Sequence, residues 1–457
     1  MLPIVTPDEM RSIDEAASEP TSVLVERAGS AVARAALRML GGSYGRTVNV
    51  IVGTGNNGND GRAAARHLAA RGVKVRIYPV STCPARLPPA DLVVDAAFGT
   101  GFHGTWQPPD VGGAPVLAVD VPSGVDALTG EVHGHVLAAE RTVTFAALKP
   151  GLLMGGGAAL AGELELVDIG LDVGDPAAQL VQGADVATWF PKRPTAAHKW
   201  NAAVRIIAGS RSMPGAAALA AAGAQRTGAG MVHVSTPGLE HAEQMPLEAV
   251  QRPLPLTGWA DQALRTMDRF HAVVLGPGLG RADDTAASTR FVAIRTPLPV
   301  VIDGDGLFAL AWNAEGAAAL LRQREAPTVL TPHDGEYQLL TGVPPARDRI
   351  MSARRLAADS DSVVVLKGPT TVVADPSGEV LVVRAGDERL ATAGTGDVLA
   401  GVIGALIAMR VDVFEAAAMG AWVHGRAALL GPVMGMVASD LLPLLPRVLS
   451  DLHEGRW

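Results

Sequence analysis

The sequence predicts an α/β protein with two three-layer αβα domains, each built around a mostly parallel sheet. Its 457 residues are more than one hydrophobic core usually serves. Short β-branched runs alternate with Ala-rich stretches of helical length, a pattern typical of parallel sheets covered by helices. The alternation lapses between about residues 171 and 195 and then resumes, which indicates two domains.

The first half contains one helix start and six candidate strands. Thr6, Pro7 and Glu9 predict a helix start, because threonine can cap, proline suits the first helical position and glutamate can close a capping box. Apolar runs predict strands at residues 47–52, 73–78, 92–95, 116–121, 141–145 and 163–167.

The second half repeats the alternation. Strands are expected at residues 204–208, 231–235, 272–275, 300–303, 328–331 and 363–366. The long apolar run at 398–409 is too short to span a bilayer, so it predicts a buried helix. We place the boundary near residue 185, which gives domains of residues 1–185 and 186–457.

Composition excludes several classes of partner. Lys and Arg number 38 against 46 Asp and Glu, a net charge of −8, which gives no electrostatic footprint for nucleic acid or an anionic membrane. Cys83 is the single cysteine, so no intrachain disulfide can form and a reducing compartment fits. The first ten residues do not resemble a secretory signal. We therefore expect a cytoplasmic protein with no nucleic-acid or membrane partner.

A glycine-rich turn, Gly53-Thr54-Gly55-Asn56-Asn57-Gly58, follows the strand at 47–52 and precedes a helix expected at 62–70. This pattern between a strand and a helix favours phosphate binding at the helix N-terminus. The next strand ends without the acid that would hold a ribose, which argues against ordinary redox use of a dinucleotide. The alternative is a tight strand-to-helix turn with Asp60 as the helix cap.

Two carboxylates end predicted strands in the same domain. Asp95 and Asp120 should emerge at the carboxyl edge of the sheet, where ligands bind, together with Asn57 and Ser123. These side chains are hard oxygen donors, suited to an alkali or alkaline-earth cation and unsuited to a soft metal. Each aspartate taken singly could equally be a cap or turn residue.

In order along the chain, the residues Gly55 to Gly61, Asp95 with Phe98 to Gly101, and Asp120 to Gly124 resemble the NAD(P)H-hydrate epimerase family, over roughly residues 5–170. The resemblance implies a Rossmann-like domain that binds potassium through Asn57, Asp95 and Ser123. It also implies contacts to the hydrated cofactor from a catalytic aspartate and two loops: Asp120, Asn56, Asn57, Gly58, Asn59, Asp60, Gly99, Thr100, Gly101, Phe102, His103, Gly104 and Thr105.

One position departs from that family, which usually has glycine where this chain has Asn59. If the backbone there has positive φ, asparagine is the least disfavoured replacement for glycine. On that hypothesis the loop holds phosphate through backbone N–H groups alone, and Asn59→Gly should preserve or raise epimerase activity.

In the second half, Ala391 to Gly396 leads through Asp397 into the apolar run at 398–409. Small residues at a helix N-terminus leave backbone N–H groups free for an anion, and we call this segment the anion hole. A carboxylate there suits a general base beside a transferring phosphoryl group, although a simple N-cap is the alternative for Asp397. The chain has no G-x-x-x-x-G-K-[ST] motif, so a P-loop NTPase is not supported.

Lys367, Gly368, Pro369, Thr370 and Thr371 follow the strand at 363–366 and offer a cation and hydroxyls to a nucleotide phosphate. A solvated turn is the alternative. Two further segments, Gly276-Pro277-Gly278-Leu279-Gly280 and Thr331-Pro332-His333-Asp334-Gly335-Glu336, should reach the same sheet edge. A lone histidine is more often structural than catalytic, so His333 alone indicates little.

Together these motifs resemble the ribokinase-like NAD(P)H-hydrate dehydratase family, over roughly residues 190–450. His198-Lys199 and residues 206–210 resemble its opening motif, which commonly has glycine where this chain has Ala203. The resemblance implies contacts to the hydrated cofactor from Ala216, Gly278, Gly280, His333 and the catalytic Asp397. It implies contacts to the nucleotide from Lys367, Gly368, Pro369, Thr370, Thr371 and Gly396.

The two resemblances imply one repair pathway. The first domain would interconvert the R and S hydrates of NADH and NADPH (NADHX and NADPHX), and the second would dehydrate the S epimer with ADP, giving AMP and phosphate. Magnesium is expected because phosphoryl transfer generally needs its charge. We also expect a homo-oligomer. The alternatives are a ribokinase-like small-molecule kinase and a non-catalytic binding or dimerisation role for the first domain.

Overall fold

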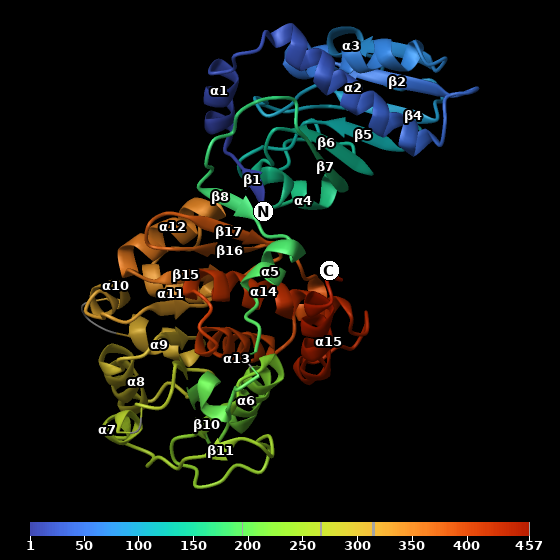
Figure 1. Ribbon diagram of the computed structural model, residues 1–457. Coiled ribbons are helices and arrows are strands. Elements are labelled where there is room, and N and C mark those ends of the chain that lie inside the picture. The colour runs from blue at the N-terminus through green and yellow to red at the C-terminus, as the bar shows by residue number, and fades with distance from the viewer. Residues whose placement is uncertain (194, 266, 313–315, 457) are drawn as a thin grey trace. The chain divides into compact units, whose positions relative to one another are not determined.

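The computed structural model describes residues 1–193, 195–265, 267–312 and 316–456. The chain separates into two compact units, Leu2–Ala178 and Gln179–Trp457, with Met1 grouped with the second (Figure 1). Each unit has its own buried apolar core. The two units are therefore described one at a time.

The first unit is built on a six-stranded parallel sheet with the order β3-β2-β4-β5-β6-β7. Its strands are β2 (Thr47–Val52), β3 (Lys74–Pro79), β4 (Leu92–Ala96), β5 (Val116–Val119), β6 (Arg141–Phe145) and β7 (Glu163–Val167). A short strand β1 (Leu2–Ile4) precedes them. All six predicted strands are confirmed, with ends that shift by one or two residues.

Helices α2 (Thr21–Leu40) and α3 (Asn56–Ala69) pack side by side on this sheet, and α1 (Pro7–Glu15) precedes them (Figure 1). The capping box predicted at Thr6 and Glu9 is present at the start of α1. A fourth helix, α4 (Gly157–Leu160), is a single turn. Side chains around Leu87, Trp106 and Phe98 form a separate apolar cluster with strands β2, β4 and β5.

Helix α3 begins six residues earlier than predicted. The sequence placed its start at residue 62, but Asn56 is already helical and Gly55 is the N-cap. Asp60 is therefore a buried residue inside the helix, and the alternative of Asp60 as the cap is wrong. The reason is close packing, because a Cβ on Gly58 would lie 2.1 Å from the Gly53 carbonyl oxygen.

The second unit is built on a larger mixed sheet. Its strands run in the order β8-β17-β16-β15-β14-β13-β12-β9-β10-β11. They are β8 (Ala178–Leu180), β9 (Ala203–Ile207), β10 (Met231–Ser235), β11 (Val250–Gln251), β12 (Ala272–Leu275), β13 (Val300–Ile302), β14 (Thr328–Leu330), β15 (Val363–Leu366), β16 (Thr371–Ala374) and β17 (Val380–Val383). The strands from β9 to β15 pair in parallel, whereas β16 and β17 add antiparallel. The six predicted strands are confirmed, and the β16–β17 hairpin was not predicted.

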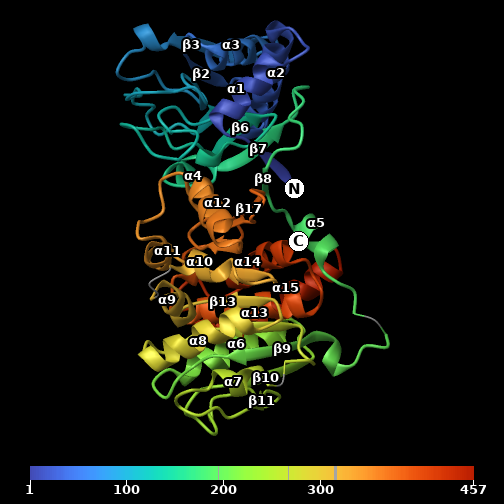
Figure 2. The ribbon, with the colours of Figure 1, turned by 90° about the vertical axis from the view of Figure 1, so that its left-hand side faces the viewer.

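Helices cover both faces of this sheet. Helices α6, α13 and α14 pack together over β9, β12, β13 and β15 to β17, and α12 packs against β15 and β16 (Figure 2). The helices of the unit are α5 (Gly183–Trp189), α6 (Pro214–Thr227), α7 (Ala260–Leu264), α8 (Asp283–Arg295), α9 (Asp305–Ala311), α10 (Ala317–Leu321), α11 (Asp334–Thr341), α12 (Arg349–Ser360), α13 (Thr395–Ala408), α14 (Val413–Leu429) and α15 (Leu441–His453).

The apolar run at 398–409 forms most of α13, which is buried along nearly its whole length, as predicted. Small residues let α6 approach it: a Cβ on Gly401 would lie 2.1 Å from the Ala220 carbonyl oxygen. Across the described residues, every helix is too short or too polar to cross a membrane.

Candidate functional sites

The first site lies at the carboxyl edge of the first unit's sheet, where β2, β4 and β5 end. Gly99 brings its parts together, because a Cβ there would lie 2.8 Å from Asp120 Oδ2 and 3.2 Å from Asn57 Cγ. The structure therefore places the loop after β4, the residue after β5 and the first turn of α3 against one another, as the sequence predicted for one sheet edge.

Asp95 and Ser123 are joined by two hydrogen bonds at this edge. The Ser123 hydroxyl donates to Asp95 Oδ1 at 2.7 Å, and the Ser123 N–H donates to Oδ2 at 3.0 Å. Both residues are almost fully buried. Burial raises the pKa of Asp95, and the hydrogen bonds from Ser123 and from the Ala97 N–H oppose that rise. The Ser123 hydroxyl also accepts from the Phe98 N–H at 2.9 Å, so it ties the loop after β4 to the pair.

Asn57 is the third member of the predicted cation set. Its side-chain oxygen and nitrogen are both buried and have no hydrogen-bond partner. An amide without partners costs free energy unless a ligand satisfies it, so Asn57 fits a bound cation. Among the described residues, no three His, Cys, Asp or Glu side chains gather to hold a metal ion. A cation here would rely on amide, hydroxyl and carbonyl oxygens beside the single carboxylate, which suits an alkali ion.

Asp120 is held by a buried lysine that the sequence analysis did not single out. Lys149 Nζ lies 2.7 Å from Asp120 Oδ1, while the N–H and hydroxyl of Thr100 donate to Oδ2 at 2.9 and 2.6 Å. Burial opposes ionisation, but Lys149 and Thr100 together lower the pKa of Asp120. Its backbone has φ of 67°, a left-handed conformation that is uncommon outside glycine and often marks a functional position.

Two further carboxyl groups face this ion pair. Burial, together with the charges of Asp120 and Asp14, raises the pKa of Asp60 to about 8. Burial also raises the pKa of Asp14, against the influence of Lys149. Asp14 comes from α1, whose start signal concerned only folding, so nothing in the sequence pattern pointed to it.

The remaining predicted residues of the first site lie at its rim. The Phe102 ring contacts the Phe98 ring in a tilted arrangement, with ring centroids 4.8 Å apart. The other members of the loop and the helix start are exposed: Gly101, His103, Gly104, Thr105, Asn56 and Asn59. Asn59 is in the helical conformation of α3, so the hypothesis of positive φ at this position is wrong.

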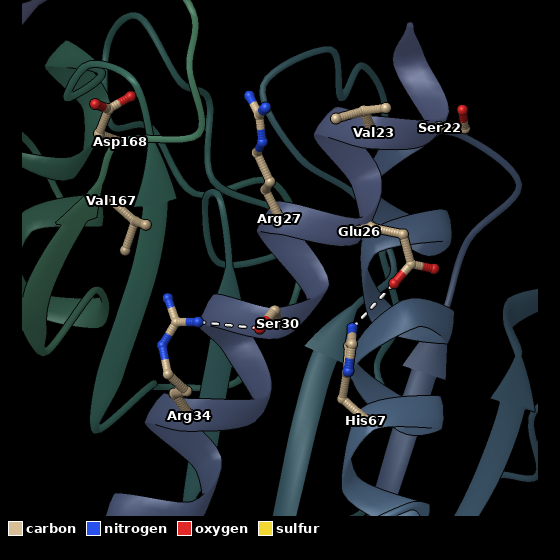
Figure 3. A pocket seen from close by; sticks show the side chains of 9 residues that line it. All are labelled: Ser22, Val23, Glu26, Arg27, Ser30, Arg34, His67, Val167 and Asp168. Atoms are coloured by element: carbon tan, nitrogen blue, oxygen red, sulfur yellow. Dashed lines mark hydrogen bonds and ion pairs between the residues drawn. The ribbon is translucent and has the colours of Figure 1, made fainter. Parts of the chain in front are cut away.

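A groove of about 590 Å³ opens elsewhere on the first unit, between α2, α3 and the end of β7 (Figure 3). Its lining includes Arg27, Arg34 and Asp168, and two of its contacts are Arg34 with Ser30 and His67 with Glu26. None of the predicted site residues lines it. We therefore build no part of the first site on this groove.

The second site is centred on the N-terminus of α13. Gly394 is the N-cap with φ of 92°, and Asp397 is the third residue of the helix. The alternative of Asp397 as the N-cap is therefore wrong. The Thr395 hydroxyl donates to the carbonyls of Leu390 and Thr392. These hydrogen bonds hold the start of α13 against the residues that precede it.

Charged groups from the segments that follow β13, β14 and β15 interact with Asp397. Lys367 Nζ lies 2.9 Å from Asp303 Oδ1 and 3.6 Å from Glu336 Oε2. A Cβ on Gly396 would lie 3.4 Å from Lys367 Nζ and 3.5 Å from Asp303 Oδ2, so this pair borders the anion hole. Burial is the largest cause of a raised pKa at Asp397, and the Asp303 charge is the next. The pKa reaches about 7, although the charge of Lys367 lowers it.

Asp303 directly follows β13, and Asp95 lies near the end of β4. A role was predicted for Asp95 but none for Asp303. The strand-end position was the signal that could have found it. The two lysines at the sites, Lys149 and Lys367, are two of only five in the chain, and that scarcity was a weaker signal.

The segment after β15 turns the chain into β16. Gly368 and Pro369 are exposed, Thr370 is buried and Thr371 opens β16. The Lys367 carbonyl accepts from Arg349 at 2.9 Å, and the Lys367 N–H donates to the Pro332 carbonyl at 2.8 Å. This turn is therefore fixed against the segment that begins α11.

Ala216 and the glycine-rich segment after β12 meet at the same end of the sheet. A Cβ on Gly278 would lie 2.6 Å from the Ala216 Cβ, and the Gly280 N–H donates to Asp305 at 2.8 Å. Ala203, where the family commonly has glycine, is in extended conformation at the start of β9 and needs no glycine.

The two histidines near this site differ in environment. His333 is exposed and caps α11, because its Nδ1 accepts from the N–H groups of Gly335 and Glu336. His424 of α14 is buried, and its ring hydrogen-bonds the backbone of Thr395 in the anion hole. Burial lowers the pKa of His424 to about 4, so this ring is neutral at physiological pH.

Sequence families match both units. Residues 204–446 match the NAD(P)H-hydrate dehydratase family, and residues 21–86 and 78–151 match the YjeF-related protein N-terminus family. The chain is 38% identical to a bifunctional NAD(P)H-hydrate repair enzyme of Mycobacterium leprae, over 91% of this chain and 90% of that one. It is 34% identical to the enzyme of the same name from Moorella thermoacetica, over 99% and 97% of the two chains.

Solved structures match the second unit. An ADP/ATP-dependent NAD(P)H-hydrate dehydratase from Bacillus subtilis, co-crystallised with ATP and Mg²⁺, is 31% identical with a TM-score of 0.51. The match covers 59% of this chain and 97% of that one. A ribokinase-like superfamily protein from Enterococcus faecalis, 22% identical with a TM-score of 0.54, shares the fold over 62% of this chain and 98% of that one.

Proposed function

The chain belongs to the bifunctional NAD(P)H-hydrate repair enzymes, and from this premise we propose how its two sites divide the work. The enzyme carries an epimerase and a dehydratase activity for hydrated NADH and NADPH. We assign the epimerase to the unit Leu2–Ala178 and the dehydratase to the unit Gln179–Trp457. The observation that supports this assignment is that each unit has a carboxylate near a helix N-terminus that suits an anion: Asp120 beside α3 and Asp397 in α13.

At the first site, Asn57, Asp95 and Ser123 would hold potassium. The unpartnered Asn57 amide supports this set, because a buried amide needs a partner, and the buried Asp95 carboxylate supplies negative charge for a cation. Bound potassium would supply positive charge beside the pyrophosphate of the hydrated cofactor. The chain's own part is to bind that pyrophosphate with the free N–H groups of Asn56, Asn57 and Gly58 at the start of α3.

Asp120 would meet the reacting end of the hydrated cofactor. Its carboxylate is fixed from two sides and ionised, so it can accept a hydrogen bond from the substrate without moving. The loop Gly99 to Thr105 would close over the same ligand. Thr100 serves both purposes, because it belongs to this loop and holds Asp120.

At the second site, Asp397 would act as general base. It takes the proton from the 6-hydroxyl of the S epimer while the hydroxyl oxygen bonds to the terminal phosphorus of ADP, and AMP leaves. The N–H groups of Gly394 to Gly396 stabilise the charge that develops on the transferred phosphoryl group. Phosphate then leaves the ring carbon as the neighbouring carbon loses a proton, which restores the nicotinamide ring.

The nucleotide would bind beside Asp397, against Lys367 to Thr371 and Gly396. Lys367 and Asp303 border the anion hole, so they lie where a phosphate and its magnesium would be expected. Magnesium would neutralise phosphate charge during transfer. Ala216, Gly278, Gly280 and His333 would line the space for the hydrated cofactor, and ADP is the donor we propose. A homo-oligomeric state and a cytoplasmic location stay predictions.

A product assay separates this function from a small-molecule kinase with a similar second site. The hydrates of NADH are incubated with ADP or ATP and magnesium, and the products are separated by chromatography. We expect NADH and free phosphate, with no stable phosphorylated product. Accumulation of a phosphorylated hydrate would support the kinase and contradict the dehydratase assignment.

A second assay tests the cation set. Potassium is titrated into the epimerase reaction of the wild-type chain and of Asp95→Ala. We expect potassium-dependent epimer exchange that Asp95→Ala weakens, because the cation loses its one charged ligand. Exchange that is indifferent to potassium and to this substitution would show that the metal assignment is wrong.

A further inference from the structure

Lys149 is deeply buried at the first site, with 1% of its surface exposed. Its ammonium has three oxygen partners: Asp120 Oδ1 at 2.7 Å, Thr144 Oγ1 at 3.0 Å and the Phe145 carbonyl at 3.1 Å. An ammonium group has three protons to donate, so these partners account for all of them. The side chain is therefore fixed in one orientation.

Asp120 is fixed by the same arrangement. Lys149 holds one carboxylate oxygen, and Thr100 holds the other through two hydrogen bonds. The Thr144 hydroxyl, which accepts from Lys149, also lies 3.3 Å from Asp120 Oδ1. A carboxylate held at both oxygens on a left-handed backbone has little freedom to rotate, and Lys149 supplies the charged contact among those that hold it.

Two other carboxyl groups near the Lys149–Asp120 ion pair increase the need for the positive charge of Lys149. Asp14 from α1 and Asp60 from α3 both interact electrostatically with Asp120. Asp120 and Asp14 both interact with the Lys149 ammonium, and Asp60 interacts with both of these carboxyl groups. Without that ammonium, Asp120 would be a buried charge next to two other acids, which strongly disfavours its ionised form.

We propose that Lys149 is a positioning residue of the epimerase site, which fixes the Asp120 carboxylate in the orientation that meets the hydrated cofactor. Asp14 and Asp60 complete this cluster from the side of the helices. The proposal rests on the epimerase assignment of the first unit. It adds a residue to that site which acts through Asp120 and does not itself touch the substrate.

The test compares Lys149→Met and Lys149→Arg with wild type in the full-length chain. Epimer exchange of hydrated NADH is measured by chromatographic separation of the R and S forms from pH 5 to 9. Lys74→Met is the matched control, since Lys74 is an exposed lysine on β3 of the same unit. The dehydratase activity of each variant shows that the second unit is intact.

We expect Lys149→Met to lower kcat of exchange by roughly a hundredfold, with a smaller change in KM, because Asp120 is misplaced and no longer held ionised. The acid limb of its pH profile should move to higher pH. Lys149→Arg should recover part of the rate, and Lys74→Met should match wild type. A Lys149→Met chain with the wild-type rate and profile would overturn the proposal.

Lys149→Met could lose activity because it unfolds or because Asp120 is misplaced. The double variant Asp120→Asn, Lys149→Met distinguishes these two causes. Removing both charges leaves no unpaired buried ion, so thermal stability should return toward that of wild type. The exchange rate should stay low, because the Asp120 carboxylate is gone. A double variant as unstable as Lys149→Met would show that Lys149 is only structural, and one with both stability and rate restored would show that exchange needs no positioned Asp120; either result would overturn the proposal. A wild-type chain without epimer exchange would instead contradict the proposed function itself.

Discussion

Asp397 and Asp120 are both partly buried carboxyl groups near helix starts, but their pKa values are moved in opposite directions. Burial, followed by the charge of Asp303, raises the pKa of Asp397 to about 7. Asp120 contacts Lys149 and Thr100, and its pKa is lowered. A pKa near the working pH suits a residue that takes up a proton, whereas a fixed negative charge suits a residue that orients a ligand.

The pKa of Asp397 predicts the pH dependence of dehydration. Because the base must be ionised, the rate should rise with pH through about 7 and reach a plateau above it; at pH 6 it should be about one tenth of the plateau. Asp303→Asn removes a charge that raises this pKa, so its profile should move to lower pH. The measurement is NADH formation from the S hydrate at saturating nucleotide. A pH-independent rate between 5 and 8 would contradict Asp397 as the base.

The helical conformation of Asn59 revises the expectation for its substitution. No left-handed strain is present for glycine to relieve, so Asn59→Gly should not accelerate epimer exchange. It should lower the free energy of unfolding by a few tenths of a kcal/mol, and Asn59→Ala should raise it by a similar amount. Urea unfolding and exchange rates of the three chains check this. Faster exchange in Asn59→Gly would mean that the asparagine side chain obstructs the ligand.

Sequence reasoning found the site residues that occur in local patterns. Asp95, Asp120 and Asp397 stand at strand ends or in glycine-rich turns, and all three lie at the sites. Lys149 and Asp14 were missed because they reach the first site from segments whose local sequence gives no such pattern. Their roles depend on burial and on neighbours distant in sequence, which only the folded chain brings together.

At the scale of elements, close backbone packing explains where α3 begins. The sequence assigned Gly53 to Gly58 to a loop, because glycine and asparagine disfavour helices. Burial overrides that preference, since Gly58 lets the first turn of α3 lie directly against Gly53 at the end of β2. The β16–β17 hairpin was not predicted because alternation with helices indicates parallel strands, whereas this antiparallel hairpin follows β15 with no helix between them.

Gly58→Ala tests this packing. The added Cβ would meet the Gly53 carbonyl oxygen at 2.1 Å and the Gly53 nitrogen at 2.8 Å, so α3 must shift. We expect a loss of about 2 kcal/mol in the stability of the first unit and a severe loss of epimer exchange. Gly55→Ala is the control, because a Cβ there meets nothing within 4 Å. Equal stability of the two variants would refute the packing argument.

At the scale of the whole molecule, the chain joins two sheets whose candidate sites use no residue in common. The division into two units and the parallel sheets followed from length and from the alternation of apolar runs. The likeness to bifunctional repair enzymes covers both units, so the two activities belong to one chain. The central claim is that each activity depends on its own site.

The most direct test follows both epimers of hydrated NADH over time, with ADP and magnesium, in Asp397→Asn, Asp120→Asn and an equal mixture of the two. Asp397→Asn should abolish dehydration and leave epimer exchange intact. Asp120→Asn should consume only the S epimer at the wild-type rate and leave R to its slow spontaneous exchange. The mixture should repair both epimers. If either folded variant lost both activities, or if the mixture failed to repair R, the account of two independent sites would be contradicted.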